Sequence, residues 1–545
     1  MIVAARGTAP ADVVFTHAKI FNPFTCSWDE GNLAVKDGRV LGTGSYSGQI
    51  VYDMAEKYIV PGLIDAHVHI ESSLLTPREY ARLVARHGTT TVIADPHEIA
   101  NVAGIAGLDF MLREREGAAI DIRYMLPSCV PATPLDVGGA RLDAKDLAAF
   151  TDREGILGLG ELMNYPGVLA GDSEVLAKIG LFALRDGHAP LLTGNDLNAY
   201  ILAGLQSDHE CTRRDEAEEK LKKGMYIYIR EGSTERNIEE LAPLVTPFTV
   251  PRCCFATDDC HADLLMHDGH IDRCIRRAIV CGMPVELALR MATLSAAERF
   301  GLSDRGALAP GRWADFCVVD DPREFIVERV FISGREFIGT KMHSSRNIAV
   351  PFRCSVPSFN DIHINGKGTA RVIGLVPHQI VTRSLIREWN GEAGLHEDVL
   401  KIVVCNRYGN GTRGVGLVHG FGFTHGAIAS SIAHDAHNLV AVGTSDDAII
   451  RAISEVIRMD GGMAAVHNKE LAGLPLDCAG LMSTLPYEDV AGRLSTLNAI
   501  TRKIGGIDDP FMYLSFLSLT VIPALRITDR GVFDCTGFRD VPLFT

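Results

Sequence analysis

Y-I-V-P-G-L-I-D-A-H-V-H-I-E, residues 58–71, is a short apolar run that ends with two histidines, His67 and His69. Side chains two positions apart on a β-strand point to the same face, so the two imidazoles would lie side by side. Neutral imidazole is the commonest metal ligand among side chains, so the pair predicts two ligands for one ion at a strand end. The motif alone leaves another interpretation open, in which the two histidines only make hydrogen bonds.

The residues that follow alternate between strand-like and helix-like segments. Thr76-Pro77-Arg78-Glu79 predicts a helix start, with Thr76 at the N-cap and Pro77 at N1. Helices are also expected at 215–223 and 284–292. Buried parallel strands are predicted at 89–95, 122–129, 156–161, 225–230 and 253–258. Repeated β–α units of this length favour a (β/α)8 barrel over residues 61–300, with a doubly wound open sheet as the alternative.

Two strand-rich segments flank this region. Residues 12–20 and 32–41 alternate apolar and polar side chains, with a tight turn predicted at Asp37-Gly38. Residues 306–320 and 330–338 repeat the pattern, with a turn at Ser333-Gly334. We expect residues 1–60 and 301–350 to form one small β-sandwich domain built from both flanks. Two separate β modules are the alternative.

The remaining section, residues 362–545, is expected to form an additional C-terminal α/β domain. It has strands predicted at 400–405 and 439–442 and a helix predicted at 446–459. The apolar run 510–525 is short for a membrane span and contains Pro523, so we expect it to pack inside a domain. The apolar C-terminal section could also supply a subunit interface, and we expect a homodimer or a higher homo-oligomer.

The composition of the chain indicates which binding partners and which cell compartment to expect. The 545-residue chain is 47% hydrophobic and 22% charged, and it carries a formal net charge of −15. Binding of phosphate chains depends on clustered Lys and Arg, so we expect neither nucleic acid nor an anionic membrane as a partner. The chain begins without a signal-peptide pattern, and its 13 cysteines show no C-x-x-C spacing. We therefore expect reduced thiols and a cytoplasmic protein.

Four further polar residues stand where strands are expected to end, namely Glu161, His188, His209 and Asp258. In a (β/α)8 barrel the functional side chains gather at the carboxyl ends of the strands. Each of the four, taken singly, is explained by solvation, capping or a structural hydrogen bond. Together with His67 and His69 they form a ligand set for two divalent ions bridged by Glu161. Two such ions could bind water as hydroxide near neutral pH.

The stretch P-G-L-I-D-A-H-V-H-I-E-S-S resembles the first-strand signature of the amidohydrolase superfamily, and more closely that of bacterial adenine deaminases. The resemblance covers almost the whole chain, including D-P-H-E-I-A-N at 95–101, G-H-A-P at 187–190, G-L-Q-S-D-H-E-C at 204–211, T-D-D at 257–259, G-A-I-A-S-S-I-A-H-D-A-H-N at 426–438 and P-F-M-Y-L-S-F-L-S-L at 510–519. Ordinary superfamily members lack the last region, so the match is specific to the adenine deaminase branch.

The resemblance implies a metal-dependent barrel with two divalent ions per chain, manganese or iron, with zinc as an alternative. It implies a first ion ligated by His67, His69, Glu161 and Asp258, and a second ion ligated by Glu161, His188 and His209. Many superfamily relatives bridge their ions with a carboxylated lysine. The matching position here is Glu161, so no carbamate is needed.

The implied reaction is hydrolytic deamination of adenine to hypoxanthine and ammonia, as in purine salvage. A metal-bound hydroxide would attack C6, and Asp258 would accept its proton and pass it to the leaving amine. Glu98 is the candidate acid that protonates the ring, with a pKa raised by burial near the metals. A carboxylate at a helix start is the other interpretation of Glu98. Asp259 would orient a histidine ligand.

Two other functions stay open. One is an amidohydrolase that acts on a related cyclic amidine or amide, and the other is a catalytically silent purine-binding relative. The C-terminal section adds a polar cluster in an apolar region, His434, Asp435, His437 and Asn438. This cluster would either close over the barrel mouth and contribute to the purine pocket, or form a hydrogen-bond network at a domain interface.

Overall fold

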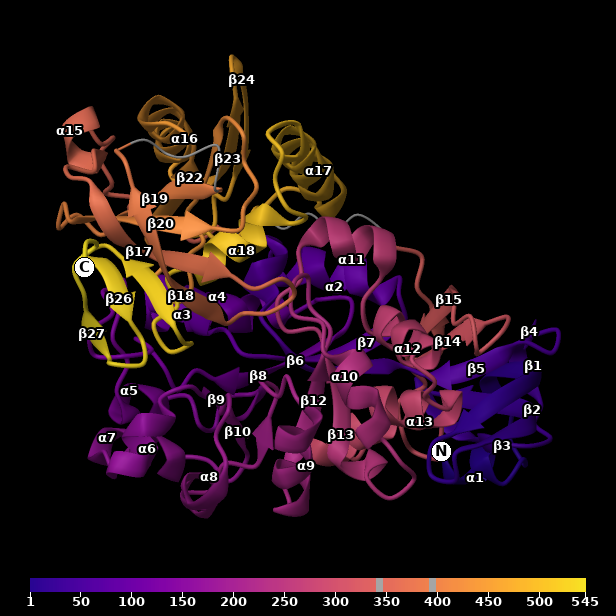
Figure 1. Ribbon diagram of the computed structural model, residues 1–545. Helices are drawn as coiled ribbons and strands as arrows, with labels where there is room; N and C mark the ends of the chain where they lie inside the picture. Colours follow the sequence, from indigo (N-terminus) through magenta and orange to yellow (C-terminus); the bar gives the residue numbers. More distant parts are fainter. Residues whose placement is uncertain (340–346, 392–397) are drawn as a thin grey trace.

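The computed structural model describes residues 1–339, 347–391 and 398–545 (Figure 1). The segments 340–346 and 392–397, which fall within the predicted domains 301–350 and 362–545, lie outside the described residues. Parallel strands in sequence order form a five-stranded sheet from β6 to β10 and a three-stranded sheet from β11 to β13. Their bounds are β6 (Leu63–Val68), β7 (Thr89–Ala94), β8 (Asp121–Leu126), β9 (Ile156–Leu162), β10 (Arg185–Gly187), β11 (Ser207–Asp208), β12 (Tyr226–Arg230) and β13 (Cys253–Ala256).

The parallel strands curl so that the last one returns to the first. Asp258 N–H donates to His67 O, and His69 N–H donates to Asp258 O, each across 3.0 Å. The ladder is interrupted between β10 and β11, where Gly187 N–H donates to the hydroxyl of Ser207 (3.2 Å). The result is a TIM-barrel-like α/β fold. The strands predicted at 89–95, 122–129, 156–161, 225–230 and 253–258 all fall on strands of this curled sheet.

Helices separate the parallel strands. α2 starts as predicted, with Thr76 at the N-cap and Pro77 at N1. It ends at Ala85, and Gly88, three residues later, has a φ of +84°. The main helices are α2 (Pro77–Ala85), α3 (His97–Ala103), α4 (Ile105–Arg115), α7 (Ser173–Gly180), α8 (Gly194–Leu202), α9 (Arg214–Lys222), α11 (Ala262–Asp268), α12 (Ile271–Val280) and α13 (Val285–Arg290).

Strands from both flanks of the barrel-like region hydrogen-bond into one eight-stranded sheet. Its bounds are β1 (Ala11–Asn22), β2 (Ser27–Lys36), β3 (Arg39–Thr43), β4 (Gly48–Asp53), β5 (Tyr58–Pro61), β14 (Phe316–Val319), β15 (Val327–Ile332) and β16 (Arg335–Glu336). Both predicted turns are present. Asp37 and Gly38 have φ of 51° and 73°, and Ser333 and Gly334 have the same values. Positive φ at both central residues is typical of the type I′ turn that suits a two-residue hairpin.

A second eight-stranded sheet forms the core of the C-terminal section, of which the structure describes residues 362–391 and 398–545. Its bounds are β17 (Gly368–Leu375), β18 (Thr382–Trp389), β19 (Val399–Cys405), β20 (Arg413–His419), β21 (Ala427–Ser430), β22 (Leu439–Gly443), β23 (Gly462–His467) and β24 (Glu470–Pro475). The section also has α16 (Asp446–Arg458), α17 (Tyr487–Lys503), α18 (Pro510–Phe516) and a small sheet of β25 (Leu525–Thr528), β26 (Gly531–Asp534) and β27 (Arg539–Asp540).

The C-terminal section packs on the barrel-like region, and Figure 1 shows it in orange and yellow above the parallel strands. α17 lies against α11, and Arg82 of α2 bonds to Glu488 of α17 (2.9 Å). Every residue of α18 is buried, so the apolar run 510–525 packs inside the protein as predicted and α18 offers no exposed face to a second chain. Within the described residues, no helix is long and apolar enough to cross a membrane. No disulfide joins any of the thirteen cysteines, all of which lie in the part of the chain that the structure describes.

Candidate two-metal site

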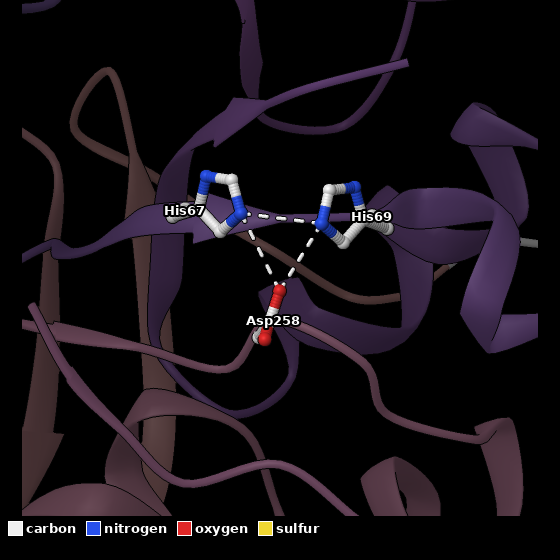
Figure 2. Close-up of side chains that lie close together, drawn as sticks. All are labelled: His67, His69 and Asp258. Atoms are coloured by element: carbon white, nitrogen blue, oxygen red, sulfur yellow. Dashed lines mark hydrogen bonds and ion pairs between the residues drawn. The ribbon is translucent and has the colours of Figure 1, made fainter. Parts of the chain in front are cut away.

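His67 and His69 lie at the end of β6, with Asp258 beside them (Figure 2). The backbone pairing of residue 258 with residues 67 and 69 fixes this arrangement. The Nε2 atoms of His67 and His69 are 3.2 Å apart. Oδ1 of Asp258 lies 3.4 Å from Nε2 of His67 and 3.1 Å from Nε2 of His69. His69 Nδ1 lies 3.0 Å from the carbonyl of Asp95, which orients the ring and leaves Nε2 toward Asp258.

Glu161 stands between two groups of histidines. Its Oε1 atom lies 3.2 Å from His69 Nε2 and 3.7 Å from His67 Nε2. Its Oε2 atom lies 2.6 Å from His188 Nδ1 and 3.3 Å from His209 Nε2. Burial opposes the negative charge of this carboxylate, but His209 and His188 hold its pKa well below the ordinary value. One carboxylate therefore faces both groups at once.

The spacing of these atoms fits metal ions. Four ligand atoms at about 2.1 Å from one ion in a tetrahedron lie about 3.4 Å apart. The facing atoms of His67, His69, Asp258 and Glu161 lie 3.1 to 3.7 Å apart. Mixed imidazole and carboxylate donors suit manganese, iron and zinc. The structure thus brings together all six residues that the sequence predicted as ligands.

Two charged residues at this site were not predicted from the sequence. Arg230, at the end of β12, donates from Nη1 to Oδ2 of Asp258 (2.7 Å) and from Nη2 to Oε2 of Glu210 (3.1 Å). Glu210 Oε1 lies 3.4 Å from His209 Nε2 and 3.7 Å from His188 Nδ1, so it is a further candidate ligand. Burial opposes the charge of Asp258, but Arg230, His67 and His69 hold its pKa well below the ordinary value. In the sequence, the position of both residues near the end of a strand is the signal that could have identified them as site residues.

Glu98 differs from its prediction. It lies in the first turn of α3. Burial alone would raise its pKa, but His434, His97 and His437 hold the pKa well below the ordinary value. The expectation of a raised pKa is therefore wrong, because three imidazoles surround the buried carboxylate and outweigh the effect of burial. Those imidazoles come partly from the C-terminal section.

His97 was also missed, although it stands in the D-P-H-E motif. Its Nδ1 atom lies 3.6 Å from Oε1 of Glu161, and its Nε2 atom lies 3.2 Å from Glu98 and 3.6 Å from Asp435. It therefore connects the Glu161 centre with the polar cluster of the C-terminal section.

The remaining polar candidates separate into different roles. Asp259 accepts a hydrogen bond from the hydroxyl of Ser72, in place of the histidine that the sequence suggested. Of the C-terminal cluster, His434 and His437 contact Glu98, whereas Asn438 accepts from the backbone N–H of Arg407 (3.1 Å) and holds a turn of its own section. A narrow space separates the two parts of the protein here, lined by Ser72, His261, Ser430, Ile432, His434, Met463, Phe511, Met512 and Ser515.

Comparison with known proteins assigns the family. Residues 58–337 match the model of the amidohydrolase family, and residues 379–539 match that of the adenine deaminase C-terminal domain. The curled sheet with its strand-end histidines and carboxylates, together with the first match, defines a hydrolase of the amidohydrolase class. The sequence is 64% identical to an adenine deaminase of Methanoregula boonei, over 100% of this chain and 98% of that protein. The chain belongs to the adenine deaminase family.

A second adenine deaminase is similar over nearly the whole chain, and solved structures match a smaller part of it. An adenine deaminase of Methanoculleus marisnigri is 59% identical over 94% of this chain and 99% of its own. Among solved structures, the N-acetyl-D-glucosamine-6-phosphate deacetylase from Mycobacterium smegmatis matches 60% of this chain and 100% of its own, with 18% identity and a TM-score of 0.47. The resemblance noted in the sequence is therefore confirmed along the full chain by the adenine deaminases.

Proposed function

We propose that this protein hydrolyses adenine to hypoxanthine and ammonia. The observation that supports this most is the position of Glu161, whose two oxygens face separate pairs of histidines across 2.6 to 3.7 Å. The family indicates the substrate, because relatives that are similar over nearly the whole chain are named adenine deaminase.

Two divalent ions would be held by these residues. His67, His69, Glu161 and Asp258 would hold the first ion, and Glu161, His188 and His209 the second. When bound, such ions supply positive charge that lets water act as a nucleophile near neutral pH. Manganese and iron suit the donor set best, and zinc is the alternative.

Asp258 is the proposed base. Arg230 engages Oδ2, so Oδ1 is the oxygen that faces the ligand cluster. Its low pKa keeps the carboxylate ionised and able to take a proton from the attacking water. That proton would pass to the leaving amine, which departs as ammonia. The second proton of the water balances the reaction, because hypoxanthine carries one on a ring nitrogen.

Glu98 is proposed to relay a proton to the ring nitrogen: it is ionised, so it would first accept the second proton of the attacking water and then pass it to the ring. It is buried, it lies on α3 beside His97, and His97 lies 3.6 Å from Glu161. For the purine to enter here, the barrel-like region and the C-terminal section would have to move apart at the closed gap lined by Ser72, His261 and Phe511. An apolar wall with a few polar groups suits a neutral heterocycle.

We propose a chain of three domains. Residues 61–300 would be a closed (β/α)8 barrel, residues 1–60 and 301–350 one small β domain, and residues 362–545 the third domain.

A homodimer or higher oligomer would cover exposed apolar side chains such as Leu202 and Phe248, which are 89% and 91% exposed. Light scattering of the purified protein measures the oligomeric state. The expected compartment is the cytoplasm, which localisation of a tagged protein tests.

Ammonia release tests the proposed activity. Metal-loaded protein is incubated separately with adenine, adenosine, other aminopurines and simple cyclic amides. We expect ammonia and hypoxanthine in equal amounts from adenine and far less product from the others. Turnover of a cyclic amide but not of adenine would support the other amidohydrolase activity. Tight binding of adenine without product would support a silent relative.

A further inference from the structure

Glu98 is held by two histidines from a distant part of the chain. Its Oε1 atom contacts His434 Nδ1, and its Oε2 atom contacts His437 Nε2. Both histidines lie between β21 and β22 of the C-terminal section, 336 and 339 positions away in sequence. All three side chains are buried. Each oxygen of the carboxylate thus has its own imidazole partner.

The two imidazoles are themselves fixed by the C-terminal section. His434 stacks on Phe516 of α18, with ring centroids 4.6 Å apart and planes 16° from parallel, and its backbone N–H donates to the carbonyl of Ser515 (2.9 Å). His437 Nδ1 accepts from the N–H of Ala433 (3.4 Å). Since Nδ1 accepts, the proton of a neutral His437 is on Nε2, the atom that faces Glu98.

The charge at His434 also favours donation to Glu98. Burial lowers the pKa of this imidazole, but the carboxylate of Glu98 raises it to about 9. His434 is therefore protonated at neutral pH, and its Nδ1–H donates to Oε1 of Glu98. The carboxylate accepts one hydrogen bond on each oxygen, so its plane is fixed.

Glu98, His434 and His437 are also one of the groups of side chains whose atoms could hold a metal ion. In the structure the carboxylate of Glu98 is in direct hydrogen-bond contact with both imidazoles. Metal content distinguishes the two roles, because the loss of positioning residues leaves the number of bound ions unchanged and the loss of ligands does not.

We propose that the C-terminal section completes the active site, with His434 and His437 as positioning residues that orient the carboxylate of Glu98 toward the substrate ring. This inference rests on the proposed deamination of adenine. It assigns a chemical role to two histidines that do not belong to the metal ligand set. The barrel-like region alone would hold the ions but would leave Glu98 without its two partners.

Matched substitutions test the role of each nitrogen. His434→Asn keeps an N–H donor near the position of Nδ1, and His437→Gln keeps one near Nε2, whereas His434→Leu and His437→Leu remove the donors. We expect each leucine variant to lower kcat about 10- to 100-fold and to change KM less than about threefold. The asparagine and glutamine variants should recover most of the lost kcat. His363→Leu, at an exposed histidine of the same section, is the control, and we expect no change.

Metal content and a double-mutant cycle complete the test. The leucine variants should keep the wild-type metal content. In a Glu98→Gln background, His434→Leu should lower kcat less than about twofold further, because both changes act on one group. An equal loss in both backgrounds, a wild-type kcat in the leucine variants, or the loss of one bound ion would overturn the inference. Failure of the wild type to deaminate adenine would instead overturn the proposed function, and the inference with it.

Discussion

Oε2 of Glu161 lies 2.6 Å from Nδ1 of His188, on the side of the carboxylate that faces away from the first histidine pair. The other oxygen, Oε1, faces His69 at 3.2 Å. A carboxylate in this position can bridge two cations and reduce the repulsion between them. The two halves of the candidate site therefore depend on one side chain.

Glu161→Gln tests this bridge. A neutral amide removes the charge that both ions need, so we expect kcat to fall more than about 100-fold, beyond the loss typical of residues that only support a ligand. At least one ion per chain should also be lost, as measured by elemental analysis. Glu30→Gln, at an exposed position on β2, is the control. A variant with wild-type rate and metal content would show that Glu161 is not the bridge.

Arg230→Lys tests how Asp258 is held. The planar guanidinium binds Asp258 and Glu210 at once, and a lysine ammonium cannot reproduce that fork. We expect kcat to fall about 10- to 100-fold. Arg277→Lys, in an exposed pair with Glu239, should leave kcat unchanged. Equal values of kcat for the two variants would mean that the two-sided contact of Arg230 with Asp258 and Glu210 does not affect the proposed base, Asp258.

Lys220→Met tests a buried charge network behind His209. Lys220 Nζ donates to the Ala189 carbonyl (2.7 Å), Asp208 (2.9 Å) and Glu216 (2.6 Å), and its side chain is fully buried. Removing the cation leaves buried carboxylates unpaired, which typically costs about 3 to 5 kcal/mol. Urea unfolding measures this loss. Lys222→Met, on the exposed side of the same helix, should change the free energy of unfolding by less than about 0.5 kcal/mol. Similar values for the two variants would contradict the account.

Glu488 gives a pH-dependent contact between α17 and α2. The hydrogen bond from Arg82 lowers the pKa of Glu488 from 4.5 to about 2. A lowered pKa in the folded state means that the contribution to stability is complete above pH 4.5 and is lost as the pH falls toward 2. The difference in melting temperature between wild type and Glu488→Gln should thus be largest near neutral pH and should narrow below pH 4.5. A constant difference from pH 7 to pH 3 would exclude this linkage.

Local patterns predicted much of this fold and site. The i, i+2 spacing of His67 and His69 and the strand ends at Glu161 and Asp258 depend only on chain periodicity, and the structure brings these residues together. The turn at Asp37-Gly38 was predictable for the same reason, because its positive φ values favour particular residues.

Other features depend on contacts between distant segments. Arg230 and Glu210 resemble ordinary surface charges in the sequence, and they pair only because β11 and β12 are neighbours. The direction of the pKa shift at Glu98 is set by His434, which lies 336 positions away. The break between β10 and β11 lies at a side-chain hydrogen bond that periodicity does not indicate.

Metal titration of metal-free protein shows whether deamination of adenine needs two bound ions. Manganese is added stepwise to chelator-treated protein, and hypoxanthine formation from adenine is measured at each step. The account predicts a rate that rises until two ions per chain are bound and then stays constant. Full activity in the metal-free protein, or no activity on adenine with two ions bound, would contradict it.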